Sequence, residues 1–377
     1  MSLIENRRYF RAFCVLFYQT AIEHKFANMK LISVVYIARC SILVYNGSIL
    51  LFAGAAVLYC VIMGDIINSR GIGDEEREGK MRAVVDVLDG INAAYGDILM
   101  ADFGLVRGDA FEGVLFSRTF AARIVRDIIR GICRVSGVLV RISVVTGELV
   151  TRSIDRNEVN GPAFYKAVSD LNKLKTSKMN SFLQVSFDTN SVAAPVVDSL
   201  FELMDSIAGK WTGRQREIAL LMEDFGGNRN YVAEELGITT QAVGKHLASL
   251  GYRVYDNAWK NIESLLVALD YTAATDVSAA ARSLPLYGLA ERDLRAGNAP
   301  EACAMLTEAL ELARMEFGEN SLEFVHICAR LAECRFRLGE EQSARDYALL
   351  ALRLIGESGK KNPKAENAMK DILGVGA

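Results

Sequence analysis

The stretch VLYCVIMGDIINSR, residues 57–70, decides the fold because a continuous apolar run ends there at a glycine and an aspartate, Gly64 and Asp65. Such a run is typical of a central buried strand. A second Gly-Asp pair, Gly108 and Asp109, lies in FGLVRGDAFEGVLF, residues 103–116, between two short strand-like segments. Two carboxylates at one edge of a sheet can bind a divalent cation and, through it, a nucleotide triphosphate.

The sequence periodicity changes in a regular order after this stretch. Helical spacing is predicted over 74–95, 119–134 and 161–174, and strands are predicted over 103–107, 111–117, 138–150 and 182–187. With the first strand, these elements follow the order β-α-β-β-α-β plus additions. That order is typical of a ferredoxin-like or palm domain of the α+β class, which we place at 57–190. We expect one sheet, covered by helices on one face.

An all-α unit with a helix-turn-helix pattern is predicted over 191–262. After a helix at 196–209, the stretch 211–252 offers cap residues for three short helices and a tight turn at Gly237. This stretch resembles the helix-turn-helix of MarR-like and sigma-factor-like regulators. On that geometry the third helix presents a set of DNA-contacting side chains, namely Thr239, Thr240, Gln241, Lys245 and His246.

The charge of this unit leaves a second interpretation open. Residues 211–262 contain as many acidic as basic residues, which gives little general attraction to phosphates. The same three-helix geometry also serves as a protein-contact module. We expect DNA binding, by a dimer, because a single unit binds weakly on its own.

The last segment, 263–377, repeats with a shift of 42 residues. The shift superimposes small residues and glycines, for example Ala290 on Ala332 and Gly297 on Gly339. Small residues let paired helices approach closely, and the glycines end the first helix of each pair. The segment resembles tetratricopeptide repeats of a longer type. It predicts contact with a protein partner or self-association, with cap helices near 262–288 and 364–373.

The length fits two or three domains, and the composition gives the chain no strong overall electrostatic field. The 377 residues carry a net charge of −3, and the seven cysteines show no CxxC pair or zinc spacing. We therefore expect a reduced, cytoplasmic protein that is not attached to a membrane. Residues 40–64 lack charges and are long enough for a membrane helix, which is the minority interpretation. The other interpretations are that residues 1–56 result from a gene start assigned too far upstream, or that they form an extra packed segment.

Three separated motifs, VIMGDIINSR, RGDAFEG and NGPAFYKA, resemble the SatD family of bacterial proteins over residues 57–262. More distantly, the first domain resembles class III nucleotidyl cyclases and GGDEF-type palms. The resemblance implies that Asp65, Asp109 and the Ile66 carbonyl bind Mg²⁺ or Mn²⁺. It also implies a nucleotide bound near Gly64, Asn68, Ser69, Arg70, Gly108 and Glu112.

The late helix at 161–174 departs from the cyclase pattern. Cyclases use an asparagine and an arginine there, whereas this helix offers Phe164, Tyr165 and Lys166. Binding without turnover is therefore expected more than catalysis. The sequence favours a DNA-binding regulator that senses a nucleotide. An active nucleotidyl enzyme and a protein-interaction scaffold are the alternatives. A purely structural explanation also remains open, in which the two Gly-Asp pairs only cap turns and bind no ligand.

Overall fold

The apolar run after residue 57 forms β4 (Tyr59–Ile66), the central strand of a five-stranded sheet. The computed structural model describes residues 34–37, 40–45, 48–53, 57–71, 73–106, 108–176, 183–276, 281–358 and 363–374. Side chains are not described at 34–53 or at residues 70, 74, 75, 358, 363 and 364. All eight residues of β4 are buried, as a continuous apolar strand requires.

The sheet has the order β5-β6-β4-β7-β8 and is mixed. Its other strands are β5 (Leu99–Val106), β6 (Ala110–Leu115), β7 (Val140–Gly147) and β8 (Gln184–Asp188). β4 pairs antiparallel with β6 and β7, whereas β8 runs parallel to β7. The register places Asp65 opposite Ala110 on one side and Arg141 on the other. The α+β class expected from the sequence is confirmed.

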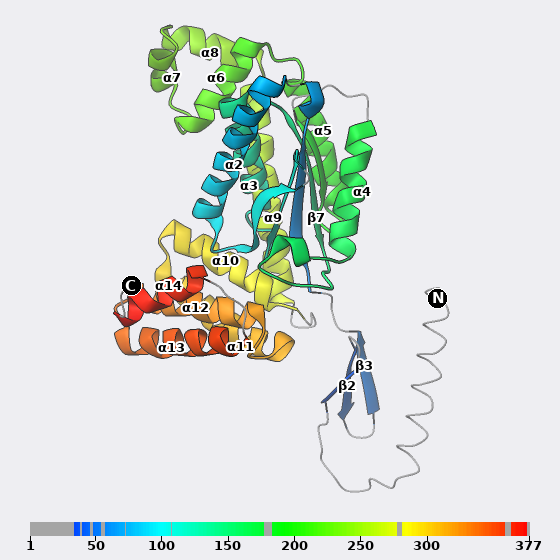
Figure 1. Ribbon diagram of the computed structural model, residues 1–377, viewed down its shortest axis with the longest axis vertical. Helices are drawn as coiled ribbons and strands as arrows, with labels where there is room; N and C mark the ends of the chain where they lie inside the picture. The colour runs from blue at the N-terminus through cyan, green and yellow to red at the C-terminus, as the bar shows by residue number, and fades with distance from the viewer. Residues whose placement is uncertain are drawn as a thin grey trace, which may run out of the picture. The chain divides into compact units, whose positions relative to one another are not determined.

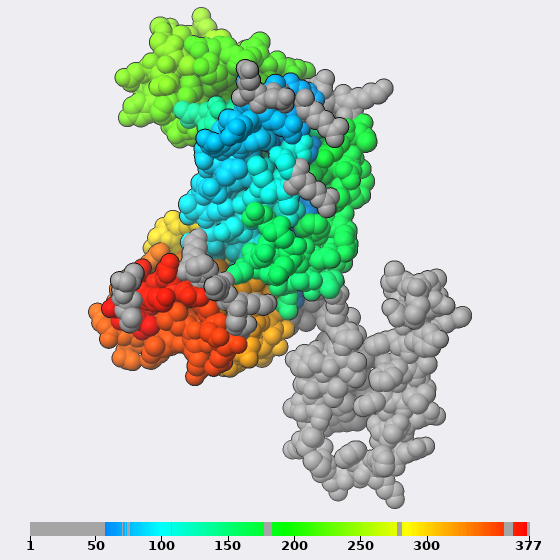
Figure 2. All heavy atoms as spheres, viewed as in Figure 1, coloured from blue at the N-terminus to red at the C-terminus, as the bar shows by residue number. Residues whose placement is uncertain are grey.

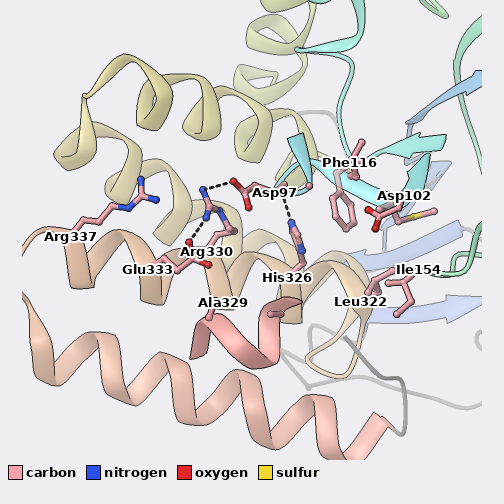
Figure 3. A pocket seen from close by; sticks show the side chains of 15 residues that line it. Asp97, Asp102, Phe116, Ile154, Leu322, His326, Ala329, Arg330, Glu333 and Arg337 are labelled. Carbon is pink, nitrogen blue, oxygen red and sulfur yellow. Dashed lines mark hydrogen bonds and ion pairs between the residues drawn. The ribbon is translucent and has the colours of Figure 1, made fainter. Parts of the chain in front are cut away.

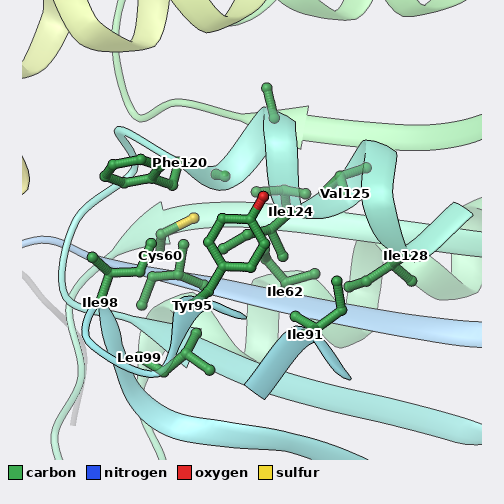
Figure 4. Close-up of a cluster of buried hydrophobic side chains, with 14 of the residues drawn as sticks. Cys60, Ile62, Ile91, Tyr95, Ile98, Leu99, Phe120, Ile124, Val125 and Ile128 are labelled. Atoms are coloured by element: carbon green, nitrogen blue, oxygen red, sulfur yellow. The ribbon is translucent and has the colours of Figure 1, made fainter. Parts of the chain in front are cut away.

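Helices cover both faces of this sheet, so the expectation of one covered face is wrong. α2 (Asp74–Tyr95) and α3 (Ala121–Ser136) lie on one side of the strands, and α4 (Pro162–Thr176) lies on the other (Figure 1). Cys60 and Ile62 join the apolar cluster beneath α2 and α3 (Figure 4). The residues that alternate with them are also mostly apolar, and burying them needs a second layer.

Four helices follow the sheet before the C-terminal segment. α5 (Ala194–Ala208) packs on β8, and α6 (Gly213–Asp224), α7 (Arg229–Glu235) and α8 (Thr240–Ser249) are the short helices of the predicted helix-turn-helix. Thr212 and Gln215 form a reciprocal capping box at the start of α6. Gly237 has a positive φ of 59°, which suits the tight turn between α7 and α8.

The long helix α9 (Tyr252–Thr275) runs across the boundary that we placed at residue 262. After it come α10 (Ser283–Ala296), α11 (Ala299–Phe317), α12 (Leu322–Arg337), α13 (Glu341–Ser358) and α14 (Pro363–Leu373). Gly297 directly follows α10 and Gly339 lies just beyond α12, both with positive φ. Figure 2 shows α6–α8 and α10–α14 at opposite ends of the unit formed by residues 56–377.

Residues 1–55 form a separate unit, of which β1 (Val34–Ile37), β2 (Cys40–Tyr45) and β3 (Ser48–Ala53) are described. These strands form an antiparallel sheet. Because β2, β3 and β4 occupy most of residues 40–64, the interpretation of that segment as one membrane helix is wrong. In the described part of the chain, no helix has the length and apolar character needed to cross a membrane. The remainder of residues 1–56 lies outside the described residues.

Candidate functional site

The two Gly-Asp turns meet at one end of β4 and line an open cleft of about 740 Å³. β4 ends at Ile66, and the chain turns at Asn68, whose φ is 56°, into a short 3-10 helix (Ser69–Gly71). The Ile66 amide donates to the Asp109 carbonyl over 3.0 Å, which holds the hairpin turn beside the end of the strand. Asp65, Ile66, Asn68, Ser69 and Asp109 therefore lie along one cleft, as the sequence predicts.

Asp65 faces two basic side chains that the sequence analysis did not identify. Its Oδ1 lies 3.0 Å from Lys175 Nζ, and its Oδ2 lies 3.4 Å from Arg141 Nη1. Arg141 comes from β7, where its Nε donates to Gln184 Oε1 over 2.8 Å. An arginine inside the apolar strand VLVRISVV was a visible signal. Lys175 is in the last turn of α4, and only the position of that helix brings it to Asp65.

Asp109 is bound to the loop that follows β4. Ser69 is buried, and its Oγ donates to Asp109 Oδ2 over 2.5 Å. Among the described residues that line the cleft, two carboxylates and two cationic side chains lie together, and their charges balance. An anionic ligand can bind the cationic groups, and a divalent cation can bind the carboxylates.

The donor set suits a cation that keeps water and phosphate oxygens in its shell. In the part of the chain that the structure describes, no three His, Cys, Asp or Glu side chains gather as a metal cluster. Mg²⁺ is often held by one or two carboxylates plus substrate phosphates, which is what Asp65 and Asp109 can offer. A cation on Asp65 would compete with Lys175 and Arg141 for the carboxylate oxygens.

Three of the four other predicted nucleotide residues have different positions or roles. Gly64 has no room for a side chain, because a Cβ there would lie 1.9 Å from Phe111 Cζ. Gly108 has a φ of 87° and serves the hairpin turn. Glu112 is buried opposite Met63, further along the sheet, and does not line the cleft. The side chain of Arg70 lies outside the described residues.

The predicted DNA-contacting residues lie at the start and along one side of α8. Gln241 and Lys245 are exposed, and His246 is half-buried. The Thr239 hydroxyl accepts from the Ala242 amide over 3.1 Å and thereby caps the helix. Thr240 Oγ1 donates to Asn230 Oδ1 over 3.1 Å, which joins α8 to α7.

Arg229, at the start of α7, is a basic side chain that the sequence analysis did not assign to DNA. A Cβ added at Gly244 would lie 4.0 Å from its Nη1, so the guanidinium reaches α8. The signal in the sequence was an arginine directly after the cap residue Asn228.

A second cavity of about 480 Å³ lies between the sheet and α12 (Figure 3). Arg330 binds Glu291 at 2.8 Å and approaches the Asp97 carboxylate at 3.6 Å. His326 Nε2 lies 2.7 Å from the Asp97 carbonyl. These polar groups bind one another across the wall of the cavity, so we assign them to the contact between helix and sheet.

Comparison with known proteins identifies a family for the part of the chain that contains the sheet and helices α6–α8. The model of the SatD family matches residues 59–266, more than half of the chain. The match contains both the cleft and helices α6–α8. No curated protein matches the chain.

Proposed function

Since the chain belongs to the SatD family, we propose that it is a DNA-binding regulator whose cleft senses a nucleotide with Mg²⁺ or Mn²⁺. The observation that carries the proposal is the meeting of the two Gly-Asp turns with Arg141 and Lys175 in one cleft. Asp65 and Asp109 would hold the cation, together with the Ile66 carbonyl. Arg141 and Lys175 would then bind phosphate oxygens.

DNA binding by α6–α8, as a helix-turn-helix, is supported by the exposure of Gln241 and Lys245 on α8. Glutamine can pair with adenine, and lysine can bind guanine or phosphate. Arg229 adds a second positive side chain beside the same helix. At α8, the positive charges of Lys245 and Arg229 offset the negative charge that acidic residues contribute elsewhere in the unit.

Binding without turnover is the version that we favour over an active nucleotidyl enzyme. On α4, Lys166 is engaged with Asp170 at 2.6 Å and with Asp188 at 3.3 Å, and Tyr165 is exposed. Neither lines the cleft or supplies a positioned group for charge that develops in a transition state, and Lys175, the residue of α4 that does line the cleft, is paired with Asp65. The palm assignment of the sheet domain belongs to the same proposal.

We assign the C-terminal helices, as tetratricopeptide-like repeats, to contact with a protein or with a second copy of the chain. Dimerisation would give a helix-turn-helix protein two half-sites. We place the protein in the cytoplasm, where cysteines remain reduced. In the scaffold alternative, the protein makes these protein contacts but binds neither DNA nor a nucleotide.

The DNA proposal is tested by a gel shift with the full chain at low salt, with genomic fragments as probe and competitor. Lys245→Ala is expected to weaken retardation and lower the salt slope by about one, and Gln241→Ala to reduce discrimination among fragments. Lys173→Ala, an exposed lysine on α4 outside both α6–α8 and the C-terminal helices, is the matched control. Absence of retardation by the unaltered chain at low salt would remove the regulator function.

The ligand proposal is tested by thermal shift with ATP, GTP and each metal, alone and together. A nucleotide at about 100 times its Kd stabilises the folded state by about 2.7 kcal/mol. Asp65→Asn and Asp109→Asn are expected to abolish the metal-dependent part of the shift. An unchanged Tm with every nucleotide would favour the structural explanation, in which the Gly-Asp turns bind no ligand. If the chain instead converts labelled ATP or GTP into product, and Asp65→Ala abolishes that product, the enzyme alternative would be favoured.

A further inference from the structure

We propose that α3 couples the cleft to helices α6–α8, so that occupation of the cleft changes how α6 is held. This inference rests on the proposed function for its biological meaning, because it gives the sensing site a route to the DNA-binding helices. The coupling itself is a mechanical property of the chain. It can be measured without nucleotide or DNA.

The first link is the segment directly after α3, which forms a wall of the cleft. The helix ends at Ser136, and residues 137–139 directly after it line the cleft. The Leu139 carbonyl accepts from the Ile67 amide over 2.8 Å, next to the carboxylate-bearing end of β4. Gly137, with a φ of 68°, caps the helix by donating its amide to the Cys133 carbonyl. A ligand that contacts the cleft wall therefore contacts backbone that continues directly into α3.

The second link is a row of arginines along one face of α3. Arg126, Arg130 and Arg134 follow one another at four-residue spacing and therefore share a side of the helix. Arg126 Nη2 lies 3.1 Å from Glu223 Oε1 on α6 and 2.8 Å from Asp256 Oδ1 on α9. Arg134 and Arg130 both approach the Asp224 carboxylate.

These ion pairs are partly withdrawn from water. Glu223 is 6 % exposed and Arg126 is 16 % exposed, so solvent screens their attraction less than it would on an open surface. Burial raises the pKa of Glu223, and the Arg126 guanidinium opposes that rise. Removing one partner of such a pair leaves a charge that is poorly solvated.

The third link is the position of Glu223 and Asp224 in the last turn of α6. Carboxylates at the C-terminal end of a helix face the negative end of its dipole, which is unfavourable without compensating cations. The arginines of α3 supply that compensation. The turn from Phe225 to Asn228 follows directly and leads into α7. The ion pairs that fix the end of α6 therefore also position α7.

Hydrogen–deuterium exchange on the full chain tests the coupling, with Lys175→Ala and Lys173→Ala as a matched pair. Both lysines are on α4, but Lys175 binds Asp65 in the cleft whereas Lys173 binds Asp170. Lys175→Ala is expected to change the exchange of amides 137–139 and of the last turn of α6 by about fivefold, the lower range of an allosteric coupling. Lys173→Ala is expected to change neither.

A second background identifies the arginines as the route. In an Arg126→Gln/Arg130→Gln/Arg134→Gln variant, which removes all three α3–α6 ion pairs, Lys175→Ala should still change exchange at 137–139 but no longer at α6. Asp65→Asn is a second perturbation of the cleft and should act like Lys175→Ala. The coupling is refuted if either cleft variant changes residues 137–139 alone in the unaltered background. It is also refuted if α6 still responds without the three arginines, or if no amide in either segment responds.

The outcomes separate this inference from the proposed function. A chain that shows the exchange pattern but retards no DNA retains the coupling and loses the regulator function. A chain that binds DNA and nucleotide but lacks the exchange pattern retains the function and loses α3 as the connection.

Discussion

Asp65 is 6 % exposed, yet each of its carboxylate oxygens faces a basic side chain. Burying a carboxylate is costly unless opposite charges and hydrogen bonds offset the loss of water. Arg141 and Lys175 provide that offset from two different elements, β7 and α4. The aspartate is thus a buried, ion-paired residue of the cleft, which distinguishes it from a turn residue exposed to solvent.

Gly64, beside Asp65, has a packing role that we expect to be visible in stability. Gly64→Ala places a Cβ against the buried ring of Phe111, and overpacking of this kind costs about 1–3 kcal/mol. Urea unfolding of the full chain measures the change. Gly79→Ala is the control, because nothing lies within 4 Å of a Cβ there and alanine favours the helix by up to about 1 kcal/mol. Equal stability of the two variants would contradict the close contact at Gly64.

At the scale of elements, β8 is an edge strand whose outward amides are covered by α5. The Leu183 amide donates to Asp205 Oδ1 over 3.0 Å, and the Phe187 amide donates to Asp198 Oδ1 over 3.1 Å. An uncovered edge can pair with another chain. α5 therefore belongs with the sheet, although the sequence analysis grouped it with the helix-turn-helix unit.

Asp198 gives an element-scale prediction. Asp198→Ala leaves the Phe187 amide without its acceptor and is expected to cost about 1–3 kcal/mol in unfolding free energy. Light scattering should also show concentration-dependent association, because the edge is opened. Asp198→Asn keeps an oxygen acceptor and should lose less stability and remain monodisperse by comparison. If alanine and asparagine behave alike, the hydrogen bond does not protect the edge.

At the scale of the whole molecule, α9 and α10 are attached to the sheet by buried polar contacts. Asp270 on α9 lies 2.8 Å from Arg118 Nε and accepts hydrogen bonds from Ser117 Oγ at 2.6 Å and Thr119 Oγ1 at 2.8 Å. A Cβ on Gly288 of α10 would lie 2.2 Å from Ser117 Oγ. Burial raises the pKa of Asp270, and Arg118 opposes that rise. The segments that we separated at residue 262 are therefore packed into one unit.

Breaking this contact should destabilise sheet and helices together. Asp270→Ala removes one partner of a buried ion pair and is expected to cost about 3–5 kcal/mol. The double variant Asp270→Leu/Arg118→Met removes both charges and should lose less than the sum of the single changes. Thermal unfolding followed by circular dichroism and tryptophan fluorescence should show coincident transitions. Two separate transitions, with only one shifted, would contradict a single cooperative unit.

Local chemistry in the sequence determined much of this protein. The apolar run before Gly64 specified β4, helical periodicity located α2 and α3, and cap residues such as Thr212 and Thr239 marked helix starts that the structure contains. The two Gly-Asp turns were also expected at one edge, because the β-α-β-β order predicts that the first strand pairs with the second strand of the hairpin. Apart from that strand pairing, these features depend on residues that are close along the chain.

Tertiary structure alone decided the partners of Asp65, the second helical layer and the attachment of α9 and α10. Lys175 is far from Asp65 in sequence, and α3 meets α6 through charges nearly a hundred residues apart. Periodicity shows that a face is apolar but does not show which element covers it. The contact that finally forms depends on competing burial and charge pairing over the whole unit, and those energies are set by the folded arrangement.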